Sequence, residues 1–235
     1  MQKIIRCQVK HILDHGGQLY SLFLEPESPA PTFLPGQYLS LALDGYSSGG
    51  VWPESRAFSI ASAPAELSLL RITYAVKGHF SARMAEELHQ GSQVWIKMPL
   101  GEFTINPDRD ACLLAGGTGV TAFSAFLAGL PAAYAHHIHL FYGARRPYQL
   151  IYRPLVESTA HRYPGLKVHY FAEQDFEGTD CLPGLIKVGT VFGAVTEPLS
   201  LVYYLAGPPE MVQALTGKLI QRGLPPGQII SEAWV

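Results

Sequence analysis

The chain has 235 residues, of which 48% are hydrophobic and 15% are charged, and its formal net charge is −2. This length allows one large domain or two ordinary ones, and the hydrophobic content excludes a wholly disordered chain. The slightly negative charge argues against a general nucleic-acid binder, which carries a basic excess.

The three cysteines, Cys7, Cys112 and Cys181, are far apart and form no C-x-x-C pair. Their spacing indicates neither a zinc ribbon nor a plant-type iron–sulfur cluster. His137 and His139 could share one strand face as metal ligands, but no third ligand has a recognisable spacing, and we predict no metal site. An odd cysteine count without a secretion signal predicts a cytoplasmic protein.

The first part of the chain reads as short strands separated by turns. Six strands are expected, at residues 4–10, 19–24, 38–43, 56–62, 67–76 and 93–98. This number and spacing predict a small antiparallel β-barrel. One helix interrupts the strands at residues 80–88, with Ser81 as its expected N-cap. The polar segment 106–110 separates a domain of residues 1–105 from one of residues 106–235.

The second part alternates strands and helices. Strands are expected at residues 111–115, 137–142, 167–171, 201–205 and 228–235, and helices at residues 120–130, 150–162 and 208–222. Such alternation predicts a parallel sheet with helices on its faces, an α/β domain.

Residues 111–144 contain no Asp, Glu, Lys or Arg, and a hydropathy scan could read them as a membrane helix. Several glycines, Pro131 and three histidines interrupt the stretch. We interpret it as a buried strand, a glycine loop, a helix and a second strand, and predict no membrane span.

Arg56, Phe58 and Ser59 stand together in the fourth expected strand. They can offer a flavin a cation for its pyrophosphate, an aromatic face for its ring system and a hydroxyl near its N5 atom. Further on, Gly78 introduces a turn before the expected helix, and the N–H groups of a helix N-terminus suit a second phosphate. The alternatives are an ordinary strand with a solvated arginine and an ordinary capped helix.

Residues 117–122 fit G-x-G-x-x-A between a strand and a helix, the context of a dinucleotide-binding loop. The acidic residue usual after the second strand is missing, and Arg145 and Arg146 stand there instead. An arginine can meet a 2′-phosphate, which favours NADPH over NADH. The alternatives are a pair of solvated arginines and a contact to the ordinary pyrophosphate. Residues 206–211 form a third strand-to-helix turn, which could be one wall of a nicotinamide pocket or a purely structural turn.

Six short motifs occur in the order R-x-F-S, G-x-F-S, P-L-G-x-F, G-G-T-G, Y-G-x-R and A-G-P-P-x-M. Together they resemble the ferredoxin–NADP reductase superfamily over the whole chain. The resemblance implies a six-stranded antiparallel flavin barrel followed by an α/β nicotinamide-nucleotide domain, with FAD and either NADPH or NADH as cofactors. The implied cofactor-binding residues are Arg56, Ala57, Phe58, Ser59, Gly78, Phe80, Ser81, Gly116, Gly117, Thr118, Gly119, Arg145, Gly207, Pro208, Pro209, Met211 and Trp234.

The resemblance also implies two catalytic residues. Ser59 would orient or hydrogen-bond the flavin N5 atom, and Glu232, in an ending similar to the superfamily's acidic-x-aromatic terminus, could relay a proton. Phe58 stands where many members have tyrosine, and Ala206 stands where many have cysteine. Free-flavin reductases of the superfamily also carry alanine there, so flavin as a diffusible substrate stays open.

The expected function is a flavin-dependent NAD(P)H oxidoreductase that passes hydride to FAD and electrons to a separate acceptor. That acceptor would be a ferredoxin, a flavodoxin or an oxygenase component. Two alternatives remain, a reductase of free flavin and a non-catalytic electron-transfer subunit that works only in a complex.

Overall fold

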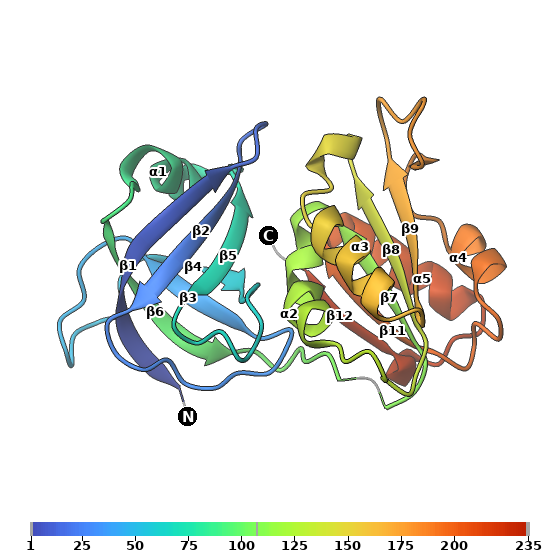
Figure 1. Ribbon diagram of the computed structural model, residues 1–235, viewed down its shortest axis with the longest axis horizontal. Helices are drawn as coiled ribbons and strands as arrows, with labels where there is room; N and C mark the ends of the chain where they lie inside the picture. The colour runs from blue at the N-terminus through green and yellow to red at the C-terminus, as the bar shows by residue number, and fades with distance from the viewer. Residues whose placement is uncertain (1, 107, 234–235) are drawn as a thin grey trace. The chain divides into compact units, whose positions relative to one another are not determined.

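A computed structural model of the protein describes residues 2–106 and 108–233 (Figure 1). The chain divides into two compact units. Unit 1 comprises Met1–Thr104 and Ser124–Phe126, and unit 2 comprises Ile105–Phe123 and Leu127–Val235. We describe each unit by itself.

Unit 1 is a six-stranded antiparallel sheet in the order β4-β3-β6-β1-β2-β5. Its strands are β1 (Lys3–Asp14), β2 (Leu19–Pro26), β3 (Tyr38–Ala42), β4 (Ser55–Ser59), β5 (Leu70–Ala75) and β6 (Gln93–Leu100). Directly after β4, the Ala61 N–H donates to the carbonyl of Arg71 in β5 at 2.8 Å, which nearly closes the sheet into a barrel. The predicted six-stranded antiparallel barrel is confirmed.

The alternation that predicted these strands also builds the barrel core. Ile5, Cys7 and Val9 in β1 are buried, whereas the residues between them are partly or fully exposed. The period of two places every second side chain on the inner face, where it packs with side chains from the other strands. Strand β4 differs, because it ends at Ser59 instead of Ser62 and lies at one end of the strand order, so Ala57 and Phe58 are only partly buried.

One helix, α1 (His79–Glu87), belongs to unit 1. Its N-cap is Gly78, and the expectation that Ser81 is the N-cap is wrong. Ser81 lies in the first turn of the helix, where its hydroxyl accepts hydrogen bonds from the N–H groups of Lys77 (2.9 Å) and Gly78 (3.1 Å). A side chain that binds the preceding turn lets the helix begin two residues before Ser81.

Unit 2 is a parallel sheet, as the alternating pattern predicted, in the order β10-β9-β8-β7-β11-β12. It has six strands instead of the five expected, because β10 is only two residues long and shows no strand pattern. Its strands are β7 (Ala111–Gly116), β8 (Ile138–Ala144), β9 (Leu166–Ala172), β10 (Leu182–Pro183), β11 (Val202–Gly207) and β12 (Ile229–Ala233). Its helices are α2 (Thr121–Gly129), α3 (Arg153–Arg162), α4 (Val188–Ala194) and α5 (Pro209–Gln221).

Helices cover both faces of this sheet (Figure 1). Buried residues of α4 and α5, among them Val191 and Leu215, pack with Leu114, Phe141 and Leu205 of the strands. Figure 1 shows α3 in front of β8 and β9 and α5 behind the strands. Helix α3 begins at Arg153, later than the expected residue 150, since Pro154 has no N–H to donate and fits only the first turn of a helix.

The uncharged stretch 111–144 folds as interpreted, into β7, a single 3₁₀ turn at Gly117–Val120, α2 and β8. Helix α2 is buried along almost its whole length, which explains why it carries no charged residue. Within residues 2–106 and 108–233, no helix combines the length and the apolar character that crossing a membrane requires.

Candidate functional site

Unit 1 brings Arg56 of β4 next to the N-terminus of α1. The Arg56 guanidinium lies over the Phe80 ring, 5.2 Å from its centroid, and Phe80 is buried in the first turn of α1. Arg56 Nη2 also lies 3.2 Å from Glu54 Oε1, and both side chains are about half exposed. Two predicted phosphate-binding segments, distant in sequence, therefore adjoin each other, and a carboxylate stands beside the cation.

Glu54 is a residue that the motif reasoning missed. It precedes Arg56 by two positions, and side chains two apart in an extended chain point to the same side. An acid at that spacing from a predicted anion-binding arginine is the signal that could have identified it.

The turn before α1 occupies the hydroxyl of Ser81 completely. Ser81 Oγ accepts from the two N–H groups of the turn and donates to the carbonyl of Gly78 at 3.0 Å. A hydroxyl has two acceptor lone pairs and one proton, so this one has no capacity left. The helix N–H groups of His79 and Phe80, which have no intrahelical acceptor, remain to meet an anion.

Gly78 itself is not required by the fold. Its backbone is extended, with φ −157° and ψ −178°, and an added Cβ would have no atom within 4 Å. The glycine thus leaves open space at the helix N-terminus where a larger side chain would intrude.

Phe58 and Ser59 end strand β4 with an aromatic ring and a hydroxyl. Phe58 is partly exposed and meets the Tyr74 ring edge-on, at 6.2 Å between centroids. Ser59 is only 5% exposed, and within the described residues its hydroxyl makes no hydrogen bond. Ala57 pairs with Ser40 in the ladder between β3 and β4 and places no bulk beside them.

If the free Ser59 hydroxyl acts on a bound flavin, its removal is expected to slow flavin reduction while the fold persists. We predict that Ser59→Ala lowers the stopped-flow rate of flavin reduction by roughly tenfold or more, the scale of losing one preorganised hydrogen bond. Ser59→Thr keeps a hydroxyl and is expected to restore most of the rate. Equal rates for the wild type and Ser59→Ala would remove Ser59 from the mechanism.

In unit 2, the glycine loop between β7 and α2 packs tightly against the end of β11. A Cβ added to Gly119 would lie 2.3 Å from the Ala206 carbonyl oxygen and 2.6 Å from Gly207 Cα. Gly117 has φ +55°, a conformation that other residues adopt only at a cost. Glycines are therefore needed here by the protein's own packing, apart from any ligand. Thr118, between them, is partly exposed and accepts a hydrogen bond from Thr121 Oγ1 through its carbonyl.

Met211, near the start of α5, completes this contact. A Cβ added to Gly116 would lie 2.5 Å from Met211 Sδ, and a Cβ added to Gly207 would lie 2.7 Å from Met211 Cε. Pro208 is the N-cap of α5 and Pro209 its first residue. The two strand-to-helix turns, predicted separately, form one packed unit.

All the segments predicted for unit 2 lie at the carboxyl edge of the parallel sheet. Gly116 of β7 aligns with Gly143 of β8, two residues before Arg145. Ala115 of β7 aligns with Ala206 of β11, which aligns in turn with Glu232 of β12. Open parallel sheets bind ligands at this edge.

The two arginines after β8 differ in their surroundings. Arg145 is exposed, and among the described residues its guanidinium has no ionic partner. Arg146 Nε lies 3.2 Å from Asp175 Oδ2 and 3.3 Å from Gln174 Oε1. Of the two, only Arg145 presents an unpaired charge.

Glu232 is a partly buried carboxyl in β12, and its Oε2 is buried without a hydrogen-bond partner among the described residues. Burial raises its pKa to about 7, because the charged form loses its solvation. The group can therefore take up or release a proton near neutral pH. Trp234, the aromatic residue of the same motif, lies outside the described residues.

The raised pKa of Glu232 makes the stability of the protein depend on pH. The folded state holds the Glu232 proton more tightly than the unfolded chain does. Protonation of Glu232 therefore stabilises the folded state fully below pH 4.5, and this contribution is lost as the pH rises to about 7. We predict that Glu232→Gln raises the melting temperature at pH 8 and leaves it almost unchanged at pH 5. Thermal denaturation at both values checks this, and an equal shift at both would contradict it.

Comparison with known proteins agrees with this geometry. Residues 113–216 match the family model described as the oxidoreductase NAD-binding domain. The toluate 1,2-dioxygenase electron transfer component of Pseudomonas putida is 30% identical over 212 residues, covering 85% of this chain and 58% of that protein. The oxidoreductase NAD-binding domain-containing protein 1 of Danio rerio is 26% identical over 261 residues, covering 99% of this chain and 92% of that protein.

Among solved structures, a ferredoxin NADP+ reductase from Neisseria gonorrhoeae with bound FAD and NADP has the same fold. The TM-score is 0.78 at 20% sequence identity, and the match covers 98% of each chain. The chain spans about three fifths of the length of the oxygenase reductase components that it matches.

Proposed function

We propose that the chain is a member of the ferredoxin–NADP reductase superfamily and a flavin-dependent NAD(P)H oxidoreductase that delivers electrons to a separate acceptor. The observation that carries this proposal is the meeting of Arg56 with the N-terminus of α1, beside the partly exposed Phe58. A cation and a helix N-terminus side by side suit the two linked phosphates of FAD.

The residues of unit 1 fit FAD. Arg56 would bind the pyrophosphate together with the N–H groups of His79 and Phe80, and Gly78 leaves the space that a phosphate needs. Ser81 would act indirectly, by holding the turn. Phe58 would lie against the ring system, and the Ser59 hydroxyl is free to bond the N5 region.

The residues of unit 2 fit a nicotinamide dinucleotide. Its pyrophosphate would lie at Gly117–Gly119, where the loop opens α2. Arg145 would reach the ribose of the adenosine half, and Gly207–Met211 would border the nicotinamide. A flavin held by these residues would supply the redox chemistry, namely hydride acceptance from a reduced nicotinamide and one- or two-electron transfer to an acceptor. The chain's own contribution would be to hold each cofactor in position, and the Glu232 carboxyl would be available for proton exchange.

Oxygenase-system reductase components among the relatives support a separate protein as the acceptor. We propose an oxygenase component or a ferredoxin, with a flavodoxin as a further possibility. The domain boundary that we propose remains at residues 105 and 106.

A second candidate function is the reduction of free flavin. Glu54 already forms an ion pair with Arg56, and the Ser81 hydroxyl already makes its hydrogen bonds to the turn before α1. Groups that could bind the flavin phosphates therefore have protein partners even without a ligand. These contacts favour a flavin that is held weakly enough to exchange.

The test is the visible absorbance spectrum of the purified, desalted protein, followed by oxidation of NADH and NADPH with ferricyanide. Retained flavin bands and rapid oxidation would support bound FAD. A colourless protein whose NAD(P)H oxidation saturates with added FMN would support the free-flavin reductase. A protein that neither binds flavin nor oxidises NAD(P)H in the presence of FAD would refute both.

A further inference from the structure

The loop after β9 is fastened to the loop after β8. The N–H groups of Glu173 and Gln174 donate to the carbonyls of Ala144 (3.3 Å) and Arg145 (2.9 Å). Arg146 adds a side-chain contact, since its Nε lies within 3.3 Å of both Gln174 Oε1 and Asp175 Oδ2. Asp175 and Arg146 thus face each other at the carboxyl edge of the sheet.

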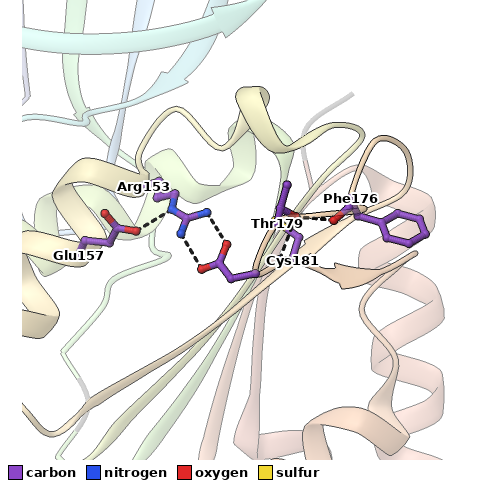
Figure 2. Close-up of polar contacts among 6 residues, drawn as sticks. Arg153, Glu157, Phe176, Thr179 and Cys181 are labelled. Atoms are coloured by element: carbon purple, nitrogen blue, oxygen red, sulfur yellow. Dashed lines mark hydrogen bonds and ion pairs between the residues drawn. The ribbon is translucent and has the colours of Figure 1, made fainter.

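The far end of this loop is fixed as well (Figure 2). Arg153 of α3 holds Asp180 through two parallel hydrogen bonds of 2.7 and 2.6 Å, and its Nε binds Glu157 at 2.6 Å. Figure 2 shows Glu157 beside Arg153 and, within the loop, the hydrogen bond from the Thr179 hydroxyl to the Phe176 carbonyl. The Arg153 guanidinium also lies over the Tyr170 ring, 4.5 Å from its centroid. The loop from Gln174 to Cys181 is therefore held at both ends, and ion pairs hold Asp175 and Asp180 in position.

Acids outnumber arginines around this edge. Five carboxylates accompany three guanidinium groups and one ammonium: Glu157, Glu173, Asp175, Glu177 and Asp180, against Arg145, Arg146, Arg153 and Lys187, which follows Ile186 near Gly143. Hydrogen bonding by Arg153 lowers the pKa of Asp180, so that this acid stays ionised. Arg146 and Arg153 are each paired with acids, which leaves the exposed Arg145 as the arginine of the three without an ionic partner among the described residues.

The two nicotinamide cofactors differ at the ribose that Arg145 would reach. NADPH carries a 2′-phosphate with close to two negative charges at neutral pH, whereas NADH carries a hydroxyl that can donate to a carboxylate. A surplus of carboxylates repels the phosphate and tolerates the hydroxyl. Arg146, the second cation that the phosphate would need, is bound to Asp175.

We propose that Asp175, by holding Arg146 in an ion pair, makes this site select NADH over NADPH. This inference rests on the proposed function and reverses the preference that the two arginines suggested in the sequence. Asp175 has φ +54°, a conformation that Asn tolerates well, so Asp175→Asn keeps the backbone and removes only the charge.

The matched control is Glu177→Gln. Glu177 is an exposed acid of the same loop, and among the described residues it has no ion pair with Arg146 or any other cation. Both substitutions remove one negative charge from the loop, but only Asp175→Asn removes the ionic partner of Arg146.

The experiment measures binding first and activity second. The affinities of AMP and adenosine 2′,5′-bisphosphate are determined by calorimetry for the wild type, both variants and the double variant Asp175→Asn/Arg146→Ala. We expect Asp175→Asn to raise the affinity for the bisphosphate at least fivefold and to change the affinity for AMP little. Glu177→Gln is expected to change either affinity less than twofold. The double variant is expected to lose the gain in affinity for the bisphosphate. In steady-state assays, the wild type is expected to use NADH at least tenfold better than NADPH in kcat/KM.

Two results overturn the inference while leaving the proposed function intact. One is a wild type that prefers NADPH, and the other is an equal response of Asp175→Asn and Glu177→Gln. A protein that binds neither AMP nor the bisphosphate would instead refute the dinucleotide site itself, and with it the proposed function.

Discussion

Gly119→Val is expected to unfold unit 2 or to destabilise it by at least about 3 kcal/mol, beyond the usual range for a point substitution. The new Cβ would meet backbone atoms of Ala206 and Gly207 at 2.3 and 2.6 Å, and backbone cannot move aside as a flexible side chain can. Relief would require the glycine loop to separate from the end of β11, which would break the contact that joins two strand-to-helix turns. Urea denaturation followed by circular dichroism measures the loss.

Gly217→Ala provides the control. Gly217 lies within α5, and a Cβ there would have no atom within 4 Å, so alanine should be neutral or stabilise the helix by about 0.5–1 kcal/mol. A Gly119→Val protein as stable as the wild type would show that the loop is not packed against β11 as the structure places it.

Arg56→Gln is expected to weaken FAD binding by roughly 30- to 100-fold, the equivalent of about 2–3 kcal/mol for a charge-assisted contact to phosphate. Because Arg56 is exposed and its partner Glu54 is equally exposed, the loss should fall on the ligand and not on the fold. Fluorescence titration of the flavin-free protein with FAD measures the affinity, and the melting temperature without flavin should remain within 2 °C, as about 0.5 kcal/mol implies.

Two further variants make this result specific. Glu54→Gln frees Arg56 and is expected to tighten FAD binding severalfold, opposite in sign to Arg56→Gln. Arg6→Gln removes a similar half-exposed cation from β1, which pairs with Glu27 at 3.6 Å, and should leave the affinity unchanged. If Arg6→Gln weakened FAD binding as much as Arg56→Gln does, the effect would reflect the overall charge of the barrel and not a site at Arg56.

The sequence was sufficient where a regular period decided the structure. The alternation of apolar and other residues predicted β1 and β2, and the change to strand–helix alternation predicted the parallel sheet of unit 2. It failed for α4, because Val188–Ala194 contains two glycines and no capping side chain. What holds this short helix is the burial of Val188 and Val191 in the core, a tertiary effect that no local pattern displays.

The candidate site was predictable in its components but not in their pairing. Arg145 and Arg146 are equivalent as sequence, and only the fold brings Asp175, 29 positions beyond Arg146, to one of them. Likewise, the motif that contains Ser81 suggested a direct phosphate contact, whereas the turn geometry consumes its hydroxyl. Contacts between residues far apart in the sequence decide which side chains remain available to a ligand, and local motifs carry no information about these contacts.

The burial of β7, α2 and β8 has a consequence for the unfolded chain. Charged gatekeepers beside unavoidable apolar segments keep unfolded molecules apart; here Asp110 and Arg145 stand at the two ends, but no charged residue interrupts residues 111–144 themselves. When heat exposes this stretch, molecules should associate through it before they refold, so thermal unfolding should become irreversible and depend on scan rate. The working lifetime of the protein would then be governed by the rate at which unfolding exposes this stretch, and not by the equilibrium free energy of unfolding.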